Sequence, residues 1–278
     1  MAHEERQFLA DGWTATIFRL SNTQKVVKVL DKKLYYPCEE QFRRELAANE
    51  RIAQHNPPAS VLKFYGVDEP LGLILELAQK GSMDNFLREC RGSKSAPSSD
   101  VLLRWARQAA EALAFVHSCG ILHCDIYVPN FFLDNELNLK LADFGAAAID
   151  GGSPLMMYRE THQLWVNDGG KWRKDISIAS EIFALGSAMF NMETCRDSMQ
   201  GLRSDEDRDE IERRLKAKEL PPVDDAPVLG RYIEKCWNSK YDSMTGLLCD
   251  LNASEAIGGA GIHPVTYPVD GAKDEVGI

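Results

Sequence analysis

The sequence predicts an α+β protein of two lobes: a small lobe built on an antiparallel β-sheet with one main helix, and a larger, mainly helical lobe. Two observations support this prediction. Short runs rich in β-branched and aromatic residues fill the chain as far as residue 78, as is typical of β-strands. Beyond Gly81, apolar residues recur three or four positions apart, which is the period of an amphipathic helix. A ligand cleft is expected where two such lobes meet.

Four β-prone runs and one helix make up the predicted small lobe, which we place at residues 6–78. The runs are residues 14–20, 25–30, 61–65 and 71–76. The helix covers residues 38–54, where Phe42, Leu46 and Ile52 share the spacing of one helical face. Two prolines follow shortly after it, and proline cannot continue a helix.

The predicted large lobe, residues 79–252, combines helices with one embedded hairpin. A long helix is expected over residues 101–118, with the N-cap candidate Ser98 before it and Gly120 as its C-terminal cap. The later elements are a hairpin of residues 130–133 and 139–142, a polar loop over 146–175, helices from 176, at 211–215 and at 228–237, and a loosely ordered tail at 253–278.

The charge of the chain argues against a general nucleic-acid binder. Its 278 residues carry 32 Lys and Arg against 42 Asp and Glu, a net charge of −10, whereas phosphate affinity comes from clustered basic side chains. Residues 1–78 are nearly balanced, with ten basic and eleven acidic side chains. An anionic ligand must therefore be held by a few well-placed cations.

The seven cysteines and the apolar segments bear on location. The cysteines are scattered and form no C-x-x-C pair, which favours a reducing compartment over a disulfide framework. The N-terminal stretch is acidic, unlike a signal peptide, and the apolar runs fall short of the roughly 20 residues that span a bilayer. We expect a cytoplasmic protein that does not enter membranes.

Two motifs in the large lobe carry groups suited to phosphate chemistry. His123 to Asn130 fits H-x-D-x-x-x-x-N, and Asp143-Phe144-Gly145 begins thirteen residues after Asn130. The predicted hairpin lies between them, so it should bring Asp125, Asn130 and Asp143 to one edge. Carboxylate and amide oxygens are the hard ligands that Mg²⁺ prefers, and Mg²⁺ in turn binds phosphates.

At these motifs the sequence resembles the eukaryotic protein kinase family, whose catalytic loop and metal-binding motif have this form and order. The resemblance covers residues 6–252. The sequence at residues 123–126 and 183–187 is most similar to filamentous-fungal kinases of tyrosine-kinase-like type. Lys28, on a predicted strand, matches the third-strand lysine of the family. Glu45, chosen over Glu50, matches its helix glutamate and is expected to pair with Lys28.

The resemblance implies an ATP-dependent protein kinase that transfers the γ-phosphoryl group to a protein hydroxyl, on Ser or Thr rather than Tyr. Asp125, Lys28 and Glu45 would be its catalytic residues, with Asp125 accepting the proton of the substrate hydroxyl. Asn130 and Asp143 would bind Mg²⁺.

The resemblance also implies where ATP would bind. Adenine would lie against the backbone from Glu76 to Ala78, with Leu75 as the gatekeeper residue, and Lys28 would hold the α- and β-phosphates. Gly12 is the single glycine retained in the glycine-rich loop, because Ala10 and Ala15 occupy the other two positions.

Several positions depart from the kinase pattern. Tyr127 stands where Ser/Thr kinases carry a lysine, and Pro129 is not the arginine that tyrosine kinases use. Loss of one preorganised cation commonly costs roughly 3 kcal/mol of transition-state stabilisation. Cys124 replaces the arginine that pairs with a phosphorylated activation loop, so we expect phosphorylation at Tyr158 or Thr161 not to be the main switch.

Further departures concern the substrate-binding floor. No Ala-Pro-Glu follows the loop, and Glu181 stands where an aspartate normally braces the catalytic loop. Two alternatives to an active protein kinase therefore remain open: a pseudokinase or nucleotide-binding scaffold with little transfer, and a kinase-like phosphotransferase acting on small molecules.

The acidic cluster at residues 204–214 has two interpretations. It is either the start of a helix, with Ser204 as N-cap and acids in the first turn, or a docking surface for a basic protein substrate.

Overall fold

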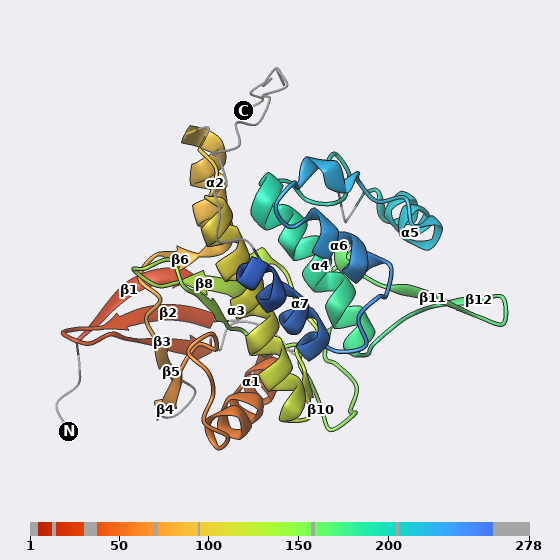
Figure 1. The fold of residues 1–278 in the computed structure, drawn as a ribbon. Helices are drawn as coiled ribbons and strands as arrows, with labels where there is room; N and C mark the ends of the chain where they lie inside the picture. Colours follow the sequence, from red (N-terminus) through yellow and green to blue (C-terminus); the bar gives the residue numbers. More distant parts are fainter. Residues whose placement is uncertain are drawn as a thin grey trace.

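The computed structural model describes residues 5–12, 15–30, 38–68, 72–93, 95–156, 159–203 and 206–257. It has the predicted two lobes (Figure 1): a five-stranded sheet with helix α1 (Cys38–Ala53), and a larger body of helices. The α+β prediction is confirmed. Most of the predicted tail, residues 258–278, lies outside the described residues, as does Ser204.

The small-lobe sheet is antiparallel throughout, in the order β1-β2-β3-β5-β4. Its strands are β1 (Arg6–Asp11), β2 (Ala15–Leu20), β3 (Lys25–Leu30), β4 (Phe64–Asp68) and β5 (Gly72–Glu76). Val26, Leu30 and Leu73 line its inner face and pack with Phe42 of α1 in one buried cluster. The apolar face of these strands and the apolar stripe of α1 thus bury each other.

Two features of this sheet differ from the sequence prediction. Strand β1 was not predicted, and the reason is physical: every one of its side chains is exposed, so no buried face marks it. The run predicted at residues 61–65 divides. Its first part joins the large lobe, where the Leu62 N–H donates to the Leu141 carbonyl at 2.9 Å, and β4 begins only at Phe64.

In the described part of the large lobe there are six α-helices: α2 (Met83–Ser93), α3 (Ser99–Ser118), α4 (Ile178–Thr194), α5 (Arg208–Ala217), α6 (Gly230–Trp237) and α7 (Met244–Ile257). The Ser98 side chain caps α3 by accepting from the Val101 N–H, and Gly120 adopts φ +72° just after it. Trp105 of α3 is fully buried and donates to the Leu137 carbonyl at 2.8 Å. Helix α4 runs through the centre, where its apolar character all round fits burial.

Short strands connect these helices. Strands β6 (Gly81–Ser82), β8 (Phe131–Leu133) and β9 (Leu139–Leu141) form one small sheet, and β7 (Ile121–Leu122) pairs with β10 (Ala148–Ile149). The predicted hairpin is therefore present as β8–β9.

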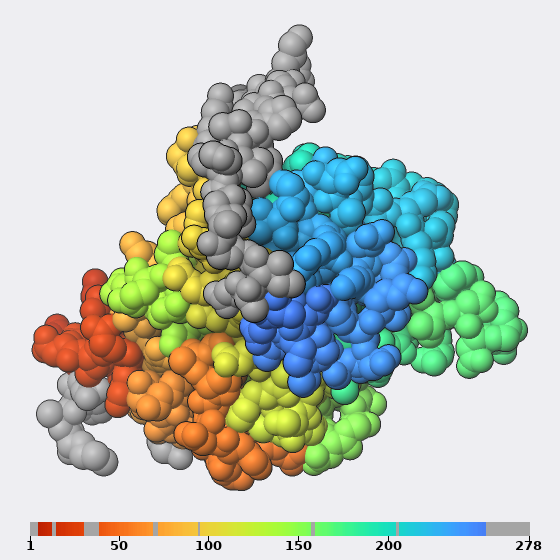
Figure 2. Space-filling view, viewed as in Figure 1, coloured from red at the N-terminus to blue at the C-terminus, as the bar shows by residue number. Residues whose placement is uncertain are grey.

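The segment predicted as a polar loop at residues 146–175 contains a second hairpin. Strands β11 (Trp165–Asp168) and β12 (Lys171–Lys174) project from the body of the molecule (Figures 1 and 2). Gly169 and Gly170 form its turn with positive φ angles of 57° and 90°, as glycine permits. Helix α7 also runs past the predicted start of the tail, to Ile257.

Within the described residues, no helix combines the length and the apolar character required to cross a membrane.

Candidate active site

The predicted catalytic loop, residues 123–130, is held by Glu181, near the start of α4. Its carboxylate accepts hydrogen bonds from the backbone N–H of His123 at 3.1 Å and of Cys124 at 2.8 Å, and it lies 2.9 Å from His117 Nε2. The side chain is fully buried. Burial opposes its ionisation, but its bonds to His117 and Cys124 lower the pKa of Glu181 below its ordinary value. A glutamate thus braces this loop where the resemblance suggested an aspartate.

Asp125 follows directly on this braced backbone. Asn130 Nδ2 donates to Asp125 Oδ2 at 2.9 Å and to the Asp125 carbonyl at 2.7 Å. Burial raises the pKa of Asp125 above its ordinary value, against the opposing effects of His123 and Asn130. A carboxylate in this state is a better proton acceptor than an exposed aspartate.

The β8–β9 hairpin brings Asp143 to the same edge. The Ala142 N–H donates to the Asn130 carbonyl at 3.0 Å, so Asp143 begins the chain segment beside Asn130. Its side chain is 48% exposed. Next to it, Phe144 is buried against His123, with ring centroids 5.0 Å apart, so the hairpin and the loop are packed as one unit.

Two residues at this edge have strained backbone angles. Cys124 and Asp143 have φ angles of +63° and +66°, the left-handed region, which costs a non-glycine residue roughly 1–2 kcal/mol. Strain of this kind persists where surrounding contacts enforce it. Here Glu181 holds Cys124 and Lys28 holds Asp143.

Lys28 of β3 joins the two lobes. Its Nζ lies 2.7 Å from Glu45 Oε2 in α1 and 3.2 Å from Asp143 Oδ1. Burial opposes the charge on Lys28, yet the two carboxylates together raise its pKa above its ordinary value. Desolvation by the neighbouring groups opposes ionisation of the Asp143 carboxylate, but Lys28 lowers the Asp143 pKa overall. Glu50 is exposed at its own position in α1, so the lysine partner is Glu45.

The two aspartates at this edge thus have pKa values displaced in opposite directions, upward for Asp125 and downward for Asp143. Such a divergence suits one carboxylate to proton transfer and the other to holding a cation. Asn130 donates through Nδ2, so Oδ1 is its acceptor atom. One carboxylate and one amide oxygen fit Mg²⁺ that also binds phosphate oxygens. The described residues contain no cluster of three or more His, Cys, Asp or Glu that could hold a metal alone.

The segment predicted to contact adenine, residues 76–78, begins at the end of β5. Leu75 and Ala78 are buried in the small-lobe core. The Glu76 carboxylate is already bound, 2.9 Å from Lys140 Nζ and 3.2 Å from the Lys63 N–H. The Glu76 N–H also donates, to the Lys63 carbonyl at 2.8 Å, so a ligand would meet Glu76 at its backbone carbonyl.

Gly12 lies at the turn of the β1–β2 hairpin, where its N–H donates to the Ala15 carbonyl at 2.8 Å. A Cβ atom at Gly12 would approach this carbonyl to 3.2 Å, so the turn is tight. Residues 13 and 14, at its tip, lie outside the described residues.

Two arginines of α1, which the sequence analysis did not single out, bind the segment of residues 146–175 that follows the hairpin. We call these residues the activation segment. Arg44 donates to the Ala147 carbonyl at 2.6 Å and to the Ser153 carbonyl at 3.1 Å, and Arg51 pairs with Asp150 at 2.6 Å. We call this set of contacts the α1 clasp. The sequence does contain a sign of this clasp, because Arg44 and Arg51 are seven residues apart and therefore share one helical face.

The two hydroxyls considered as switch sites have different positions. Thr161 is buried and lies 2.9 Å from His162 Nδ1, while Tyr158 falls outside the described residues.

Comparison with known proteins identifies the family of the chain. The protein kinase domain family matches residues 5–249. The chain belongs to the protein kinase family.

Curated relatives are named protein kinases. A probable serine/threonine-protein kinase of Dictyostelium discoideum is 27% identical over 77% of this chain and 23% of its own length. Mitogen-activated protein kinase kinase kinase 20 of Arabidopsis thaliana is 30% identical over 48% of this chain and 41% of its own. CBL-interacting protein kinase 10 of Oryza sativa is 29% identical over 53% and 33%. The matches thus cover less than half of these relatives' lengths.

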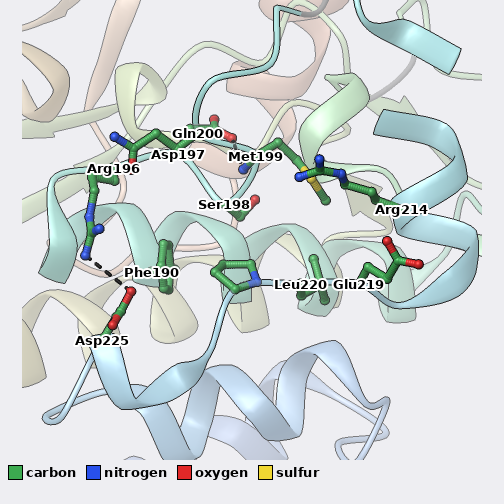
Figure 3. A pocket seen from close by; sticks show the side chains of 11 residues that line it. Phe190, Arg196, Asp197, Ser198, Met199, Gln200, Arg214, Glu219, Leu220 and Asp225 are labelled. Atoms are coloured by element: carbon green, nitrogen blue, oxygen red, sulfur yellow. Dashed lines mark hydrogen bonds and ion pairs between the residues drawn. The ribbon is translucent and has the colours of Figure 1, made fainter. Parts of the chain in front are cut away.

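A separate cavity of about 430 Å³ lies in the large lobe, between the end of α4, α5 and the segment before α6 (Figure 3). Its lining includes Phe190, Asp197 and Arg214, and none of the catalytic-loop residues. It touches the activation segment through Asp197, which accepts from Thr161 Oγ1 at 3.4 Å.

Proposed function

We propose that this chain is an ATP-dependent protein kinase that transfers the γ-phosphoryl group of ATP to a protein hydroxyl. The observation that carries the proposal is the linked set of contacts at the lobe junction. Lys28 bonds to both Glu45 and Asp143, and Asn130 bonds to Asp125. Phosphoryl transfer depends mostly on positioning and charge neutralisation, and these contacts supply positioned groups of the required kinds.

Each residue has a role that follows from its surroundings. Lys28, fixed by Glu45, would bind the α- and β-phosphates. Asp143 and Asn130 would hold Mg²⁺, which when bound neutralises phosphate charge. Asp125, with its raised pKa, would accept the proton of the substrate hydroxyl.

Adenine would bind the backbone between Glu76 and Ala78, beside Leu75, and the turn at Gly12 would approach the phosphates. We propose Ser and Thr as the acceptors, because the relative that matches 77% of this chain is named a probable serine/threonine-protein kinase.

A nucleotide-binding scaffold is the second candidate, and one observation favours it. The position two residues after Asp125 carries an uncharged Tyr127, so the catalytic loop itself offers no cation to the transferred phosphoryl group. A scaffold would bind ATP with Mg²⁺ without transferring phosphate.

The decisive experiment incubates the purified chain with Mg²⁺, γ-labelled ATP and a generic protein substrate. We expect labelled protein from the wild type and none from Asp125→Asn. Asp168→Asn, at the exposed end of β11, is the matched control and should behave as wild type. Measurable ATP binding with no transfer above the Asp125→Asn background would establish the scaffold instead.

We further propose a cytoplasmic location and protein partners without nucleic acid or membrane, on the basis of the net charge of −10 and the scattered cysteines. A preference for basic substrates has weaker support. Glu210 is bound to Arg213 and Arg214, and Glu212 to Lys216, so these acids of α5 are largely neutralised. Helix α5 begins at Arg208 after Asp207 rather than after Ser204. A peptide array that compares basic with neutral sequences would test the preference.

A further inference from the structure

An arginine of the activation segment lies over the catalytic loop. The Arg159 guanidinium carbon is 3.8 Å from the centroid of the Tyr127 ring, well within the distance of a cation–π contact. Tyr127 is the second residue after Asp125 and has extended backbone angles of φ −164° and ψ 165°. The stack therefore brings a permanent positive charge beside the proposed proton acceptor.

The backbone of Arg159 is fixed although its side chain is exposed. Its carbonyl accepts from the His162 N–H at 2.9 Å, at the start of the 3₁₀ turn Glu160–His162. Thr161 and His162 in this turn are buried, and the His162 ring lies edge-on to Tyr127 at 6.5 Å. Arg159 is thus held at one end by this turn and at the other by the stack.

The cations around the site divide between its two sides. Lys28 lies against Glu45 and Asp143, on the side where the nucleotide phosphates would lie. Arg159 lies on the other side, against the ring of Tyr127, two residues after Asp125. The side of the site that faces the acceptor hydroxyl therefore has a cation, and it comes from the activation segment.

We propose that Arg159 is a catalytic residue that contacts the transferred phosphoryl group, and that Tyr127 is the residue that positions it. The inference rests on the proposed kinase function. The bond from the γ-phosphorus to the bridging oxygen breaks with its electron pair leaving on ADP, and a bond forms to the substrate oxygen. The hydroxyl proton passes to Asp125, while Arg159 stays protonated and neutralises charge on the equatorial oxygens. An arginine suits this task because its planar fork stacks on an aromatic ring and binds phosphate oxygens.

The test compares Arg159→Ala with wild type in single-turnover transfer and in nucleotide binding. We expect transfer to fall about a hundredfold, as for the loss of one preorganised charge partner. Affinity for ADP with Mg²⁺ should stay within about twofold, because ADP lacks the group that Arg159 contacts. Affinity for ADP with Mg²⁺ and aluminium fluoride, which imitates the transferring phosphoryl group, should fall strongly. Arg88→Ala, an exposed arginine of α2, is the control and should change none of these values.

A second substitution tests the role of the charge itself. Tyr127→Lys places a cation on the catalytic loop, so in the Arg159→Ala background it should restore most of the lost transfer. Tyr127→Phe keeps the ring and should leave transfer within about threefold of wild type, whereas Tyr127→Ala should approach Arg159→Ala.

Two outcomes would overturn the proposal: full transfer by Arg159→Ala, or loss of ADP affinity equal to the loss of transfer. If the wild type itself transfers nothing above the Asp125→Asn background, the kinase function fails separately. Binding of the fluoride complex then still decides the contact: a loss confined to that complex in Arg159→Ala supports it, and unchanged binding refutes it.

Discussion

The catalytic loop with its hairpin, residues 123–145, and the activation segment that follows at 146–175 are organised differently. The first region is mostly buried, with Glu181 of α4 bonded to its backbone and Asn130 bonded to Asp125. The second is held from outside, by Arg44 and Arg51 of α1. In our proposal the first region positions the carboxylates, and the second, held by α1, supplies a cation through Arg159.

The largest effect expected from breaking this arrangement comes from the buried brace. Glu181→Ala removes a buried carboxylate that accepts from the N–H groups of His123 and Cys124, so the free energy of unfolding should fall by about 3–5 kcal/mol. Urea denaturation measures this change. Glu89→Ala, on the exposed face of α2, is the control and should stay within about 0.5 kcal/mol of wild type. A Glu181→Ala protein as stable as this control would contradict the role of the brace.

An intermediate effect is expected at the clasp. Arg44→Ala removes two charge-assisted hydrogen bonds to the activation segment, each worth roughly 1.5–3 kcal/mol at most. Phosphoryl transfer should fall by about tenfold and proteolysis within residues 146–160 should accelerate, while global unfolding changes little.

The neighbouring Arg43 provides the matched control for the clasp. It is exposed and pairs along its own helix, with Glu39, so Arg43→Ala should leave both readouts unchanged. Equal behaviour of the two variants would remove the distinction between a clasped and a self-supporting region.

The smallest effect concerns pH. The folded pKa of Glu181 lies below its ordinary value of 4.5, so the unfolded chain binds this proton more tightly than the folded one. The stability that Glu181 provides is therefore complete above about pH 4.5 and is lost as the pH falls through its folded pKa. Glu181→Gln should lack this part of the acid-induced loss in denaturation curves measured between about pH 3 and pH 6. Parallel curves for the two proteins would show that Glu181 does not titrate in this way.

The difference between residues 123–145 and residues 146–175 also explains how much could be predicted from the sequence. The hairpin and the meeting of Asp125, Asn130 and Asp143 follow from local spacing, because a short hairpin necessarily returns the chain to its own edge. The pair of Lys28 and Glu45 was predicted from the resemblance to the kinase family, and the structure contains it at 2.7 Å.

The activation segment could not be predicted in this way. Arg159 and Tyr127 are 32 residues apart in the sequence, and no periodic pattern of residues predicts that they come into contact. The hairpin β11–β12 has exposed or half-buried side chains along its whole length, so hydrophobic periodicity does not reveal it. Only its pair of glycines signals a turn.

The central claim is that these positioned residues transfer phosphate, and one measurement tests it most directly. In a single turnover with Mg²⁺ and γ-labelled ATP, label should pass to protein in the wild type, while Asp125→Asn should bind ATP with similar affinity and transfer none. Equal label in both proteins, or none in a wild type shown to bind ATP, would contradict the account.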